Sequence, residues 1–339
     1  MKKKILITGM NTLQVTEDFY KRQQLQVIPS HTSLIACLRD MGYEVIQRPV
    51  NIGEKLDEFH KVIVYIHNPS GFAGFVYNAL WAIHVRPDCV MAFDDWQTDS
   101  IYSGITSLKD PAKLFREYVR DSHKNIPENI ESYESEFIEA IQRIESKRNK
   151  MLISAFSGGD LGLLLDHPNL YRYNPNPYHI HRQAAPFFGG KERVFNFAGL
   201  VQDKTKKWLK AQQVEKTGWE LKLYGSRKDG QDRVTEDEMV NIYAQQWGIL
   251  MPGYFHAGSG WWRARFCQTA DAGSILIGEP KEMMVVYKNK DAASIKASEL
   301  PNMSDKHLED FAAFQKECLY KAHPLDKAVQ QAELSEVLK

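Results

Sequence analysis

The chain alternates short apolar runs with stretches of helical periodicity, and this alternation constrains its fold more than any other feature. In the first half, four apolar runs have the composition of strands that are buried on both faces: Lys4–Gly9, Tyr43–Ile46, Lys61–Ile66 and Cys89–Phe93. A helical pattern that ends at Gly42, a good residue to follow a helix, separates the first two runs. This order predicts a mostly parallel sheet with helices on both faces.

The same alternation begins again after residue 190. Strand-like runs recur at Val194–Phe197, Trp219–Tyr224, Trp247–Met251 and Ser274–Ile277, with helical stretches over 204–213, 236–246 and 260–272. Between the two halves, residues 172–190 are rich in proline, glycine and aromatic side chains, which is typical of a connection between domains. The charged stretch 110–150 is expected to be a helical cover on one edge of the first sheet, and a short strand over Met151–Ala155 is expected to follow it.

These patterns predict an α/β protein with two doubly wound domains. We expect one domain over 1–180, a second over 181–303, and helices over 304–339 that pack back on the first domain. Two facing Rossmann-like domains with a central cleft resemble the GT-B glycosyltransferases, and this resemblance implies that the N-terminal domain binds the acceptor and the C-terminal domain binds a nucleotide-sugar. Ligands of such sheets bind beyond the carboxyl ends of the strands.

Composition narrows the choice of partners. Lys plus Arg and Asp plus Glu both number 43, so the net charge is zero, and any DNA contact requires a local basic patch. No stretch is long and apolar enough to cross a membrane, and the apolar run after the N-terminal lysines is too short for a signal peptide. The four cysteines are far apart and are expected to be buried thiols of a cytoplasmic protein.

A glycine-rich loop before the 260–272 helix is the first candidate for anion binding. Gly258, Ser259 and Gly260 leave backbone N–H groups free to face a phosphate, and His256 directly precedes them. Arg263 and Arg265 follow within a turn or so, and a guanidinium neutralises a diphosphate well. Gln268, one turn later, is placed to bond ribose hydroxyls.

Two more strand ends of the same domain carry suitable groups. Gly199 ends one strand and Lys206 follows it, while Tyr224 and Gly225 end the next strand, where a base ring could stack. The alternative, that these cations form an ordinary solvated helix face, stays open. The sequence contains neither a G-x-G-x-x-G nor a Walker A pattern.

The candidates for acid–base chemistry follow the fourth strand of the first domain. Transfer to a hydroxyl needs a group that takes its proton, and Asp95 directly after a strand is well placed, with Asp94 and Trp96 beside it. Neighbours on a strand point to opposite faces, so only one of the two carboxylates is expected to face the ligand. The alternative is that one of them caps the next turn. An adjacent pair is not a spaced Asp-x-Asp, so no catalytic metal is predicted.

Ser30, His31 and His67 lie on loops or helix starts after strands of the first domain. Together with Trp96 they are our candidates for contacts with the acceptor or the transferred sugar. Histidines in such places are often structural or simply exposed, and that alternative stays open as well.

Several short motifs, in order along most of the chain, resemble the phage DNA β-glucosyltransferases. In the first half these are Ile28-Pro29-Ser30, Met41-Gly42, Val62-Ile63-Val64, Ser70-Gly71-Phe72 and Phe93-Asp94-Asp95. In the second half they are Phe197-Ala198-Gly199 with Lys206, Leu223-Tyr224-Gly225-Ser226-Arg227 and Arg265-Phe266-Cys267-Gln268-Thr269. The sequence departs from the family at Gln268, where the family has Glu, and at Gln202, where it has a phosphate-binding arginine.

The resemblance implies an inverting transfer of a sugar from a UDP-sugar to 5-hydroxymethylcytosine, or another hydroxymethylated pyrimidine, in double-stranded phage DNA. It implies that Asp95 is the base, that Lys206 and Arg265 meet phosphate, and that the residue at Gln268 meets ribose. The acceptor base would flip out of the duplex. We expect a monomer in the host cytoplasm that needs no cofactor for the chemistry, with Mg²⁺ considered only for product release.

Two other functions remain compatible with the residues. One is a GT-B transferase that acts on a glycan, a lipid or a small molecule, and the other is a nucleotide-sugar-binding protein without catalysis. A different sugar donor, a pentose or another hexose, also stays open because of the departures at Gln202 and Gln268. A nicotinamide dehydrogenase is disfavoured because its glycine fingerprint is missing after Gly9.

Overall fold

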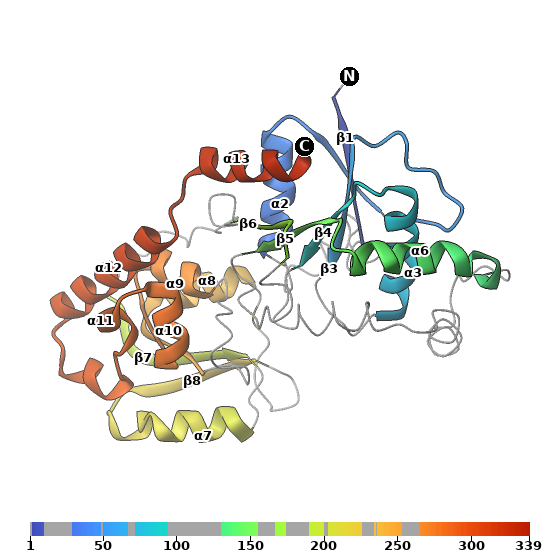
Figure 1. Cartoon of the computed structure of the whole chain (residues 1–339). Helices are drawn as coiled ribbons and strands as arrows, with labels where there is room; N and C mark the ends of the chain where they lie inside the picture. The colour runs from blue at the N-terminus through green and yellow to red at the C-terminus, as the bar shows by residue number, and fades with distance from the viewer. Residues whose placement is uncertain are drawn as a thin grey trace. The chain divides into compact units, whose positions relative to one another are not determined.

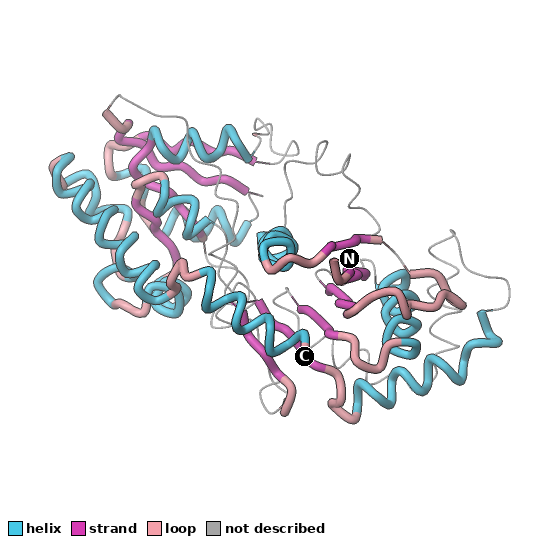
Figure 2. Tube along the Cα trace, turned by 90° about the horizontal axis from the view of Figure 1, so that it is seen from above, coloured by secondary structure: helices cyan, strands magenta, loops and turns pink. Residues whose placement is uncertain are grey.

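The structure is a computed structural model that describes residues 2–9, 29–48, 50–66, 72–93, 130–154, 167–173, 190–199, 203–225, 234, 236–252 and 265–339. The chain divides into two compact units. Unit 1 contains the described residues from 2 to 173 together with the last segment, Asp326–Lys339. Unit 2 contains the described residues from 190 to Leu325. Each unit contains both strands and helices (Figure 2).

Unit 1 is built on a parallel sheet whose six described strands lie in the order β2-β1-β3-β4-β5-β6. The strands are β1 (Lys4–Gly9), β2 (Glu44–Gln47), β3 (Lys61–Ile66), β4 (Val90–Phe93), β5 (Lys150–Ser154) and β6 (Leu170–Tyr173). All neighbouring pairs are parallel. The chain passes from β1 to β2 on one side and then to β3 on the other, so the winding direction reverses between β1 and β3.

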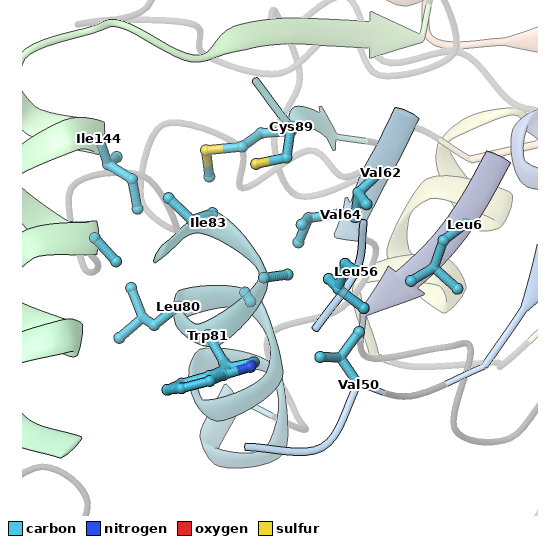
Figure 3. Packing of buried hydrophobic residues seen from close by; sticks show 14 of the residues in the cluster. Leu6, Val50, Leu56, Val62, Val64, Leu80, Trp81, Ile83, Cys89 and Ile144 are labelled. Carbon is cyan, nitrogen blue, oxygen red and sulfur yellow. The ribbon is translucent and has the colours of Figure 1, made fainter. Parts of the chain in front are cut away.

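Helices cover both faces of this sheet. They are α2 (Pro29–Asp40) and α13 (Lys327–Leu338) on one face, and α3 (Phe72–Val85) and α6 (Glu134–Glu145), preceded by the 3-10 turn η2 (Ile130–Tyr133), on the other. Figure 3 shows Leu80 and Ile83 of α3 between Val62 and Val64 of the sheet and Ile144 of α6. Each such buried aliphatic side chain stabilises the fold by about 1.5–3 kcal/mol.

Unit 2 has a smaller parallel sheet in the order β10-β9-β7-β8. Its strands are β7 (Glu192–Gly199), β8 (Glu220–Gly225), β9 (Gln246–Met251) and β10 (Ile275–Gly278). The chain runs from β7 outward to β8, then returns to the other side of β7 for β9 and β10. The winding direction of this sheet therefore reverses between β7 and β9.

The helices of unit 2 are α7 (Asp203–Ala211), α8 (Glu236–Gln245), α9 (Arg265–Asp271), α10 (Pro280–Tyr287), α11 (Lys290–Ala293) and α12 (Asp305–Ala322), with 3-10 turns η5 (Val214–Lys216) and η7 (Ala297–Asn302). In Figure 1, α7 lies on one side of the sheet and α8 and α9 lie on the other. Leu209 of α7 packs with Phe195 and Phe197 of β7 in the core of this unit.

A buried glutamine on α12 completes the hydrogen bonding of the edge strand β10. The side chain of Gln315 accepts a bond of 2.9 Å from the backbone N–H of Leu276 and donates one of 3.0 Å to its carbonyl oxygen. It also donates to the carbonyl oxygen of Ala292 at 2.9 Å. The amide thus replaces the strand that β10 lacks on its outer side.

Cations lie at the amino-terminal edge of both sheets, in different surroundings. In unit 1, Lys61 Nζ lies 3.1 Å from the carboxylate of Asp88, which also accepts bonds of 2.9 and 3.0 Å from Arg86. The carboxylate is partly desolvated, yet its hydrogen bonds and the positive charges of Arg86 and Lys61 lower the pKa of Asp88 to about 2.

In unit 2, Lys191 occupies the corresponding edge without a carboxylate among its described partners. Its three N–H groups point to the carbonyl oxygens of Ala244 and Ala272 and the hydroxyl oxygen of Ser274, at 2.7 to 2.9 Å, with the Tyr243 carbonyl oxygen farther away at 3.3 Å. The carbonyl oxygens end helices α8 and α9, where a cation is favourable. Burial lowers the pKa of Lys191 to about 8, because desolvation disfavours the charged form.

The predicted strands are confirmed, and three short elements were not predicted. β6 has a polar, aromatic composition, Leu-Tyr-Arg-Tyr, and lies at the edge of its sheet, so it lacks the apolar run of a buried strand. Helices α10 and α11 are too short to show a helical period clearly. Helix α6 confirms the C-terminal part of the predicted helical stretch 110–150, whose first part lies outside the described residues.

Candidate functional site

The carboxyl ends of β7 and β9 mark the ligand-binding edge of unit 2. Doubly wound sheets bind ligands in the crevice where the winding direction reverses, because the two helix connections leave on opposite faces there. β7 ends at Gly199, and β9 ends at Met251. β8 is next to β7 in register, so that Gly225 lies beside Gly199 and Tyr224 beside Ala198. Three of the predicted donor residues therefore lie on two adjacent strand ends.

Arg265 spans this reversal point. It is the first residue of α9, which follows β9, and its Nη2 donates a bond of 2.6 Å to the carbonyl oxygen of Ala198 near the end of β7. Its Nη1 is buried and has no hydrogen-bond partner in the part of the chain that the structure describes. A buried donor without a partner is unfavourable by about 1–3 kcal/mol, more when it is charged. An anionic ligand at this position would remove that penalty.

Gly199 shapes the turn beside Arg265. Its φ of +147° lies in the region that favours glycine, and a Cβ atom there would lie 3.1 Å from Cζ of Phe197. A side chain at position 199 would therefore strain the strand end that holds the Ala198 carbonyl. The sequence predicted the glycine from its place after a strand, whereas the Ala198 bond joins residues far apart in sequence and was not predictable.

The other described donor candidates lie on the two connections that flank the reversal. Lys206 is exposed on α7, the helix that follows β7. Gln268 is half-buried one turn after Arg265 on α9. His256, Gly258, Ser259, Gly260 and Arg263 lie outside the described residues, between Pro252 and Arg265. Their roles remain predictions.

In unit 1, the carboxyl edge of the sheet is described only in part. β4 ends at Phe93, so Asp94 follows the strand directly, and Asp94, Asp95, Trp96 and His67 lie outside the described residues. Ser30 and His31 fall in the first turn of α2, and their side chains lie outside the description. The roles predicted for these residues stay predictions.

Thr8 is a polar residue at this edge that sequence reasoning missed. It is the penultimate residue of β1, at the strand pair where the winding direction of sheet 1 reverses, and it is fully buried. Its hydroxyl has no hydrogen-bond partner among the described residues. The threonine in a mainly aliphatic strand is the feature of the sequence that could have indicated a polar group at this edge.

Two features are absent from the described residues. Within these ranges, no group of three or more His, Cys, Asp or Glu side chains is arranged to hold a metal ion. In the same part of the chain, no helix combines the length and the apolar character needed to cross a membrane.

Solved structures share this fold over the full chain. β-Glucosyltransferase of T4 phage in complex with UDP-glucose has 12% identity and a TM-score of 0.56, with 100% of both chains covered. The same phage enzyme with UDP and Mn²⁺ has 13% identity and a TM-score of 0.55, also with 100% of both chains covered. A structure described as the DNA-modifying enzyme β-glucosyltransferase has 12% identity and a TM-score of 0.53, at the same coverage.

No protein-family model matches the chain, and no curated protein matches it in sequence. The structural likeness nevertheless defines the fold class: this is an α/β protein of the GT-B class with a parallel sheet in each unit. The predicted fold class is confirmed, and the resemblance to phage β-glucosyltransferases is confirmed at the level of the fold.

Proposed function

We propose that this protein is a glycosyltransferase that moves a sugar from a UDP-sugar to the hydroxyl group of 5-hydroxymethylcytosine, or another hydroxymethylated pyrimidine, in double-stranded DNA. The observation that carries the proposal is Arg265, whose buried Nη1 lacks a described partner at the reversal point of the unit 2 sheet. The fold agrees with it, because the T4 phage enzyme of this fold was crystallised with UDP-glucose as its substrate.

The donor would bind unit 2 through its diphosphate. Arg265 is held by the Ala198 carbonyl, so its guanidinium is oriented before the ligand arrives, which lowers the entropic penalty of binding. Lys206 adds a second positive charge from the β7–α7 connection. Gln268 would bond the ribose, and Tyr224, at the end of the adjacent strand, would contact the base. The predicted loop Gly258–Gly260, with His256 and Arg263, would complete the phosphate site.

The chemistry would be a single displacement. The oxygen of the acceptor hydroxymethyl group forms a bond to the anomeric carbon of the sugar, while the bond from that carbon to the UDP phosphate oxygen breaks. The hydroxyl proton passes to Asp95, and UDP leaves with the bonding electron pair, its charge balanced by Arg265 and Lys206. Attack opposite to the leaving group inverts the anomeric centre. This assigns proton transfer to unit 1 and stabilisation of the leaving group to unit 2.

The proposal is tested by mass spectrometry of hydroxymethylated duplex DNA after incubation with the protein and a panel of UDP-sugars, with and without Mg²⁺. We expect a mass increase of one sugar residue on the hydroxymethylated base and none on unmodified DNA. Release of UDP without DNA modification would redirect the proposal to another acceptor. Absence of both modification and UDP binding by calorimetry would exclude the transferase function.

A further inference from the structure

Helix α7 carries a row of lysines on its outer face. Its inner face is anchored in the core of unit 2 through Leu209, next to the partly buried Trp208, and Thr205 is buried as well. The side chains of Lys206, Lys207 and Lys210 are exposed, as is that of Lys216 in the adjoining turn η5. The segment 204–216 contains five lysines and one acidic residue, Glu215, in a protein of zero net charge.

These lysines resemble Lys281, Lys290 and Lys296, which are also exposed and form no ion pair with a described residue, but they lie closer together along the chain and differ from three paired cations of the same unit. Lys206, Lys207, Lys210 and Lys216 form no ion pair with any described residue, whereas Arg193 pairs with Asp305 at 2.7 Å, Lys222 with Glu192 at 2.8 Å and Lys316 with Asp271 at 3.2 Å. Lys206 and Lys210 are four residues apart, a spacing at which like charges destabilise a helix by about 0.2–0.5 kcal/mol. With Asp203 at the start of α7 and Glu215 included, the segment 203–216 still carries a net charge of +3, from five lysines and two acidic residues.

The position of α7 connects this face to the candidate site. The helix begins at Asp203, a short connection after β7 ends at Gly199, beside the carbonyl group that holds Arg265. Figure 1 shows α7 on the side of the unit 2 sheet opposite to α8 and α9. Because α7 leads from the carboxyl end of β7 to the start of β8, a polyanion along it would begin at the edge where the donor is proposed to bind and extend toward the opposite edge of the sheet.

We propose that the exposed lysines of this segment, Lys207 and Lys210 on α7 and Lys216 in η5, dock the phosphate backbone of the duplex DNA acceptor. The inference rests on the proposed function, and it identifies the surface through which a protein of zero net charge holds a polyanion. Lysines bind phosphates as point charges and release condensed counterions, so such contacts give affinity without sequence preference. Lys206 is kept apart, because it is assigned to the donor.

The test compares a triple variant, Lys207→Gln, Lys210→Gln and Lys216→Gln, with a matched control. The control, Lys281→Gln, Lys290→Gln and Lys296→Gln, removes the same charge from exposed lysines elsewhere in unit 2. Binding to a fluorescent unmodified DNA duplex is measured by anisotropy over a range of salt concentrations. Binding of UDP is measured by calorimetry in parallel, and the melting temperature shows that each variant is folded.

We expect the α7 variant to lose DNA affinity on the order of tenfold or more, and its slope of log K against log salt to become shallower by about 2.7, that is, roughly 0.9 for each lost phosphate contact. The DNA affinity of the control variant should equal that of the wild type. The UDP affinity of both variants should also equal that of the wild type. Equal DNA affinity in all proteins, or an equal loss in the control, would overturn the assignment of these lysines as the DNA-binding surface. The proposed transfer to DNA would still stand. A wild-type protein that binds UDP but no duplex at any salt concentration would overturn both.

Discussion

The two units share a doubly wound parallel sheet, but the cations at the edges of the two sheets have different oxygen partners. In unit 1, Lys61 and Arg86 are tied to the carboxylate of Asp88 at the amino-terminal edge of the sheet. In unit 2, Lys191 at the same edge contacts carbonyl and hydroxyl oxygens, and Arg265 at the opposite edge contacts the Ala198 carbonyl. The partners of Lys191 and Arg265 are thus neutral carbonyl and hydroxyl groups, which orient the two side chains through hydrogen bonds.

The difference concerns single positions, because unit 2 also contains cations paired with carboxylates, such as Arg193 with Asp305, and Lys150 of unit 1 donates to carbonyl oxygens. Arg265 carries its charge at the edge of unit 2 where the donor is proposed to bind. The proposed base, Asp95, belongs to unit 1. The predictions below test this division, from the largest expected effect to the smallest.

Replacing Asp95 should have the largest effect. Asp95→Asn removes the proposed proton acceptor, and a positioned general base contributes roughly 10²–10⁴-fold to the rate. We therefore expect turnover on hydroxymethylated DNA to fall by that factor while UDP affinity, measured by calorimetry, stays unchanged. Asp94→Asn is the matched control and should keep most of its activity. Near wild-type turnover in Asp95→Asn would shift the role to Asp94, His31 or His67.

Replacing Arg265 should weaken binding of the UDP donor. Arg265→Ala removes one charge-assisted contact to the diphosphate, worth about 1.5–3 kcal/mol, which corresponds to roughly a 10- to 150-fold rise in the Kd for UDP. Arg193→Ala is the control, since Arg193 belongs to the same unit but pairs with Asp305. Calorimetry of the two variants distinguishes them, and the same Kd in Arg265→Ala and in the wild type would remove the donor site from this position.

Lys191 should make unit 2 respond to alkaline pH. Its pKa is lowered to about 8 in the folded protein from an ordinary value of 10.5, so the unfolded chain binds more protons between these pH values. The free energy of unfolding should therefore rise with pH across this window, by about 2 kcal/mol. Urea denaturation of the wild type and of Lys191→Met at both ends of the window measures this. Parallel curves for the two proteins would contradict the lowered pKa of Lys191.

Asp88 should make unit 1 respond in the acid range. Its folded pKa of about 2 lies below the ordinary 3.8, so its stabilisation is present above pH 3.8 and is lost as the pH falls toward 2. The side chain of Asp88 is 48% exposed, so solvent screening limits the effect to about 1 kcal/mol. Asp88→Asn should flatten the acid limb of a stability profile measured by denaturation. An unchanged acid limb would show that the ion pairs contribute nothing.

The sequence predicted the strands of both sheets because each is a short aliphatic run, and runs such as Lys4–Gly9 or Lys61–Ile66 suit only a strand that is buried on both faces. It missed β6 and α10, where the edge position or the small length removes the periodic signal. The local sequence pattern therefore predicts elements that are fully buried, but it does not predict the short elements at the edges of the sheets.

The candidate site was predictable only as a list of residue types. Gly199 and Arg265 were predicted from their places after strands and before a helix. Their convergence depends on the bond from Arg265 to Ala198, which joins positions 67 residues apart. The partners of Lys191 are distributed in the same way, because they come from the ends of two helices and the start of a strand. Such contacts depend on how helices and strands pack together, so they cannot be predicted from the local sequence.

The amide of Gln315 has a consequence for association between molecules. The outer edge of a sheet is a template on which a second chain can add a strand, and natural proteins block it. By occupying the outward N–H and C=O of Leu276, Gln315 removes the central template position of β10. Because Leu276 and Gln315 are both buried, α12 covers this edge, and the amide lets it do so without leaving the polar groups of Leu276 unpaired. Gln315→Leu should keep the edge covered but lower the free energy of unfolding, by about 1–3 kcal/mol for each unpaired group, which denaturation measures.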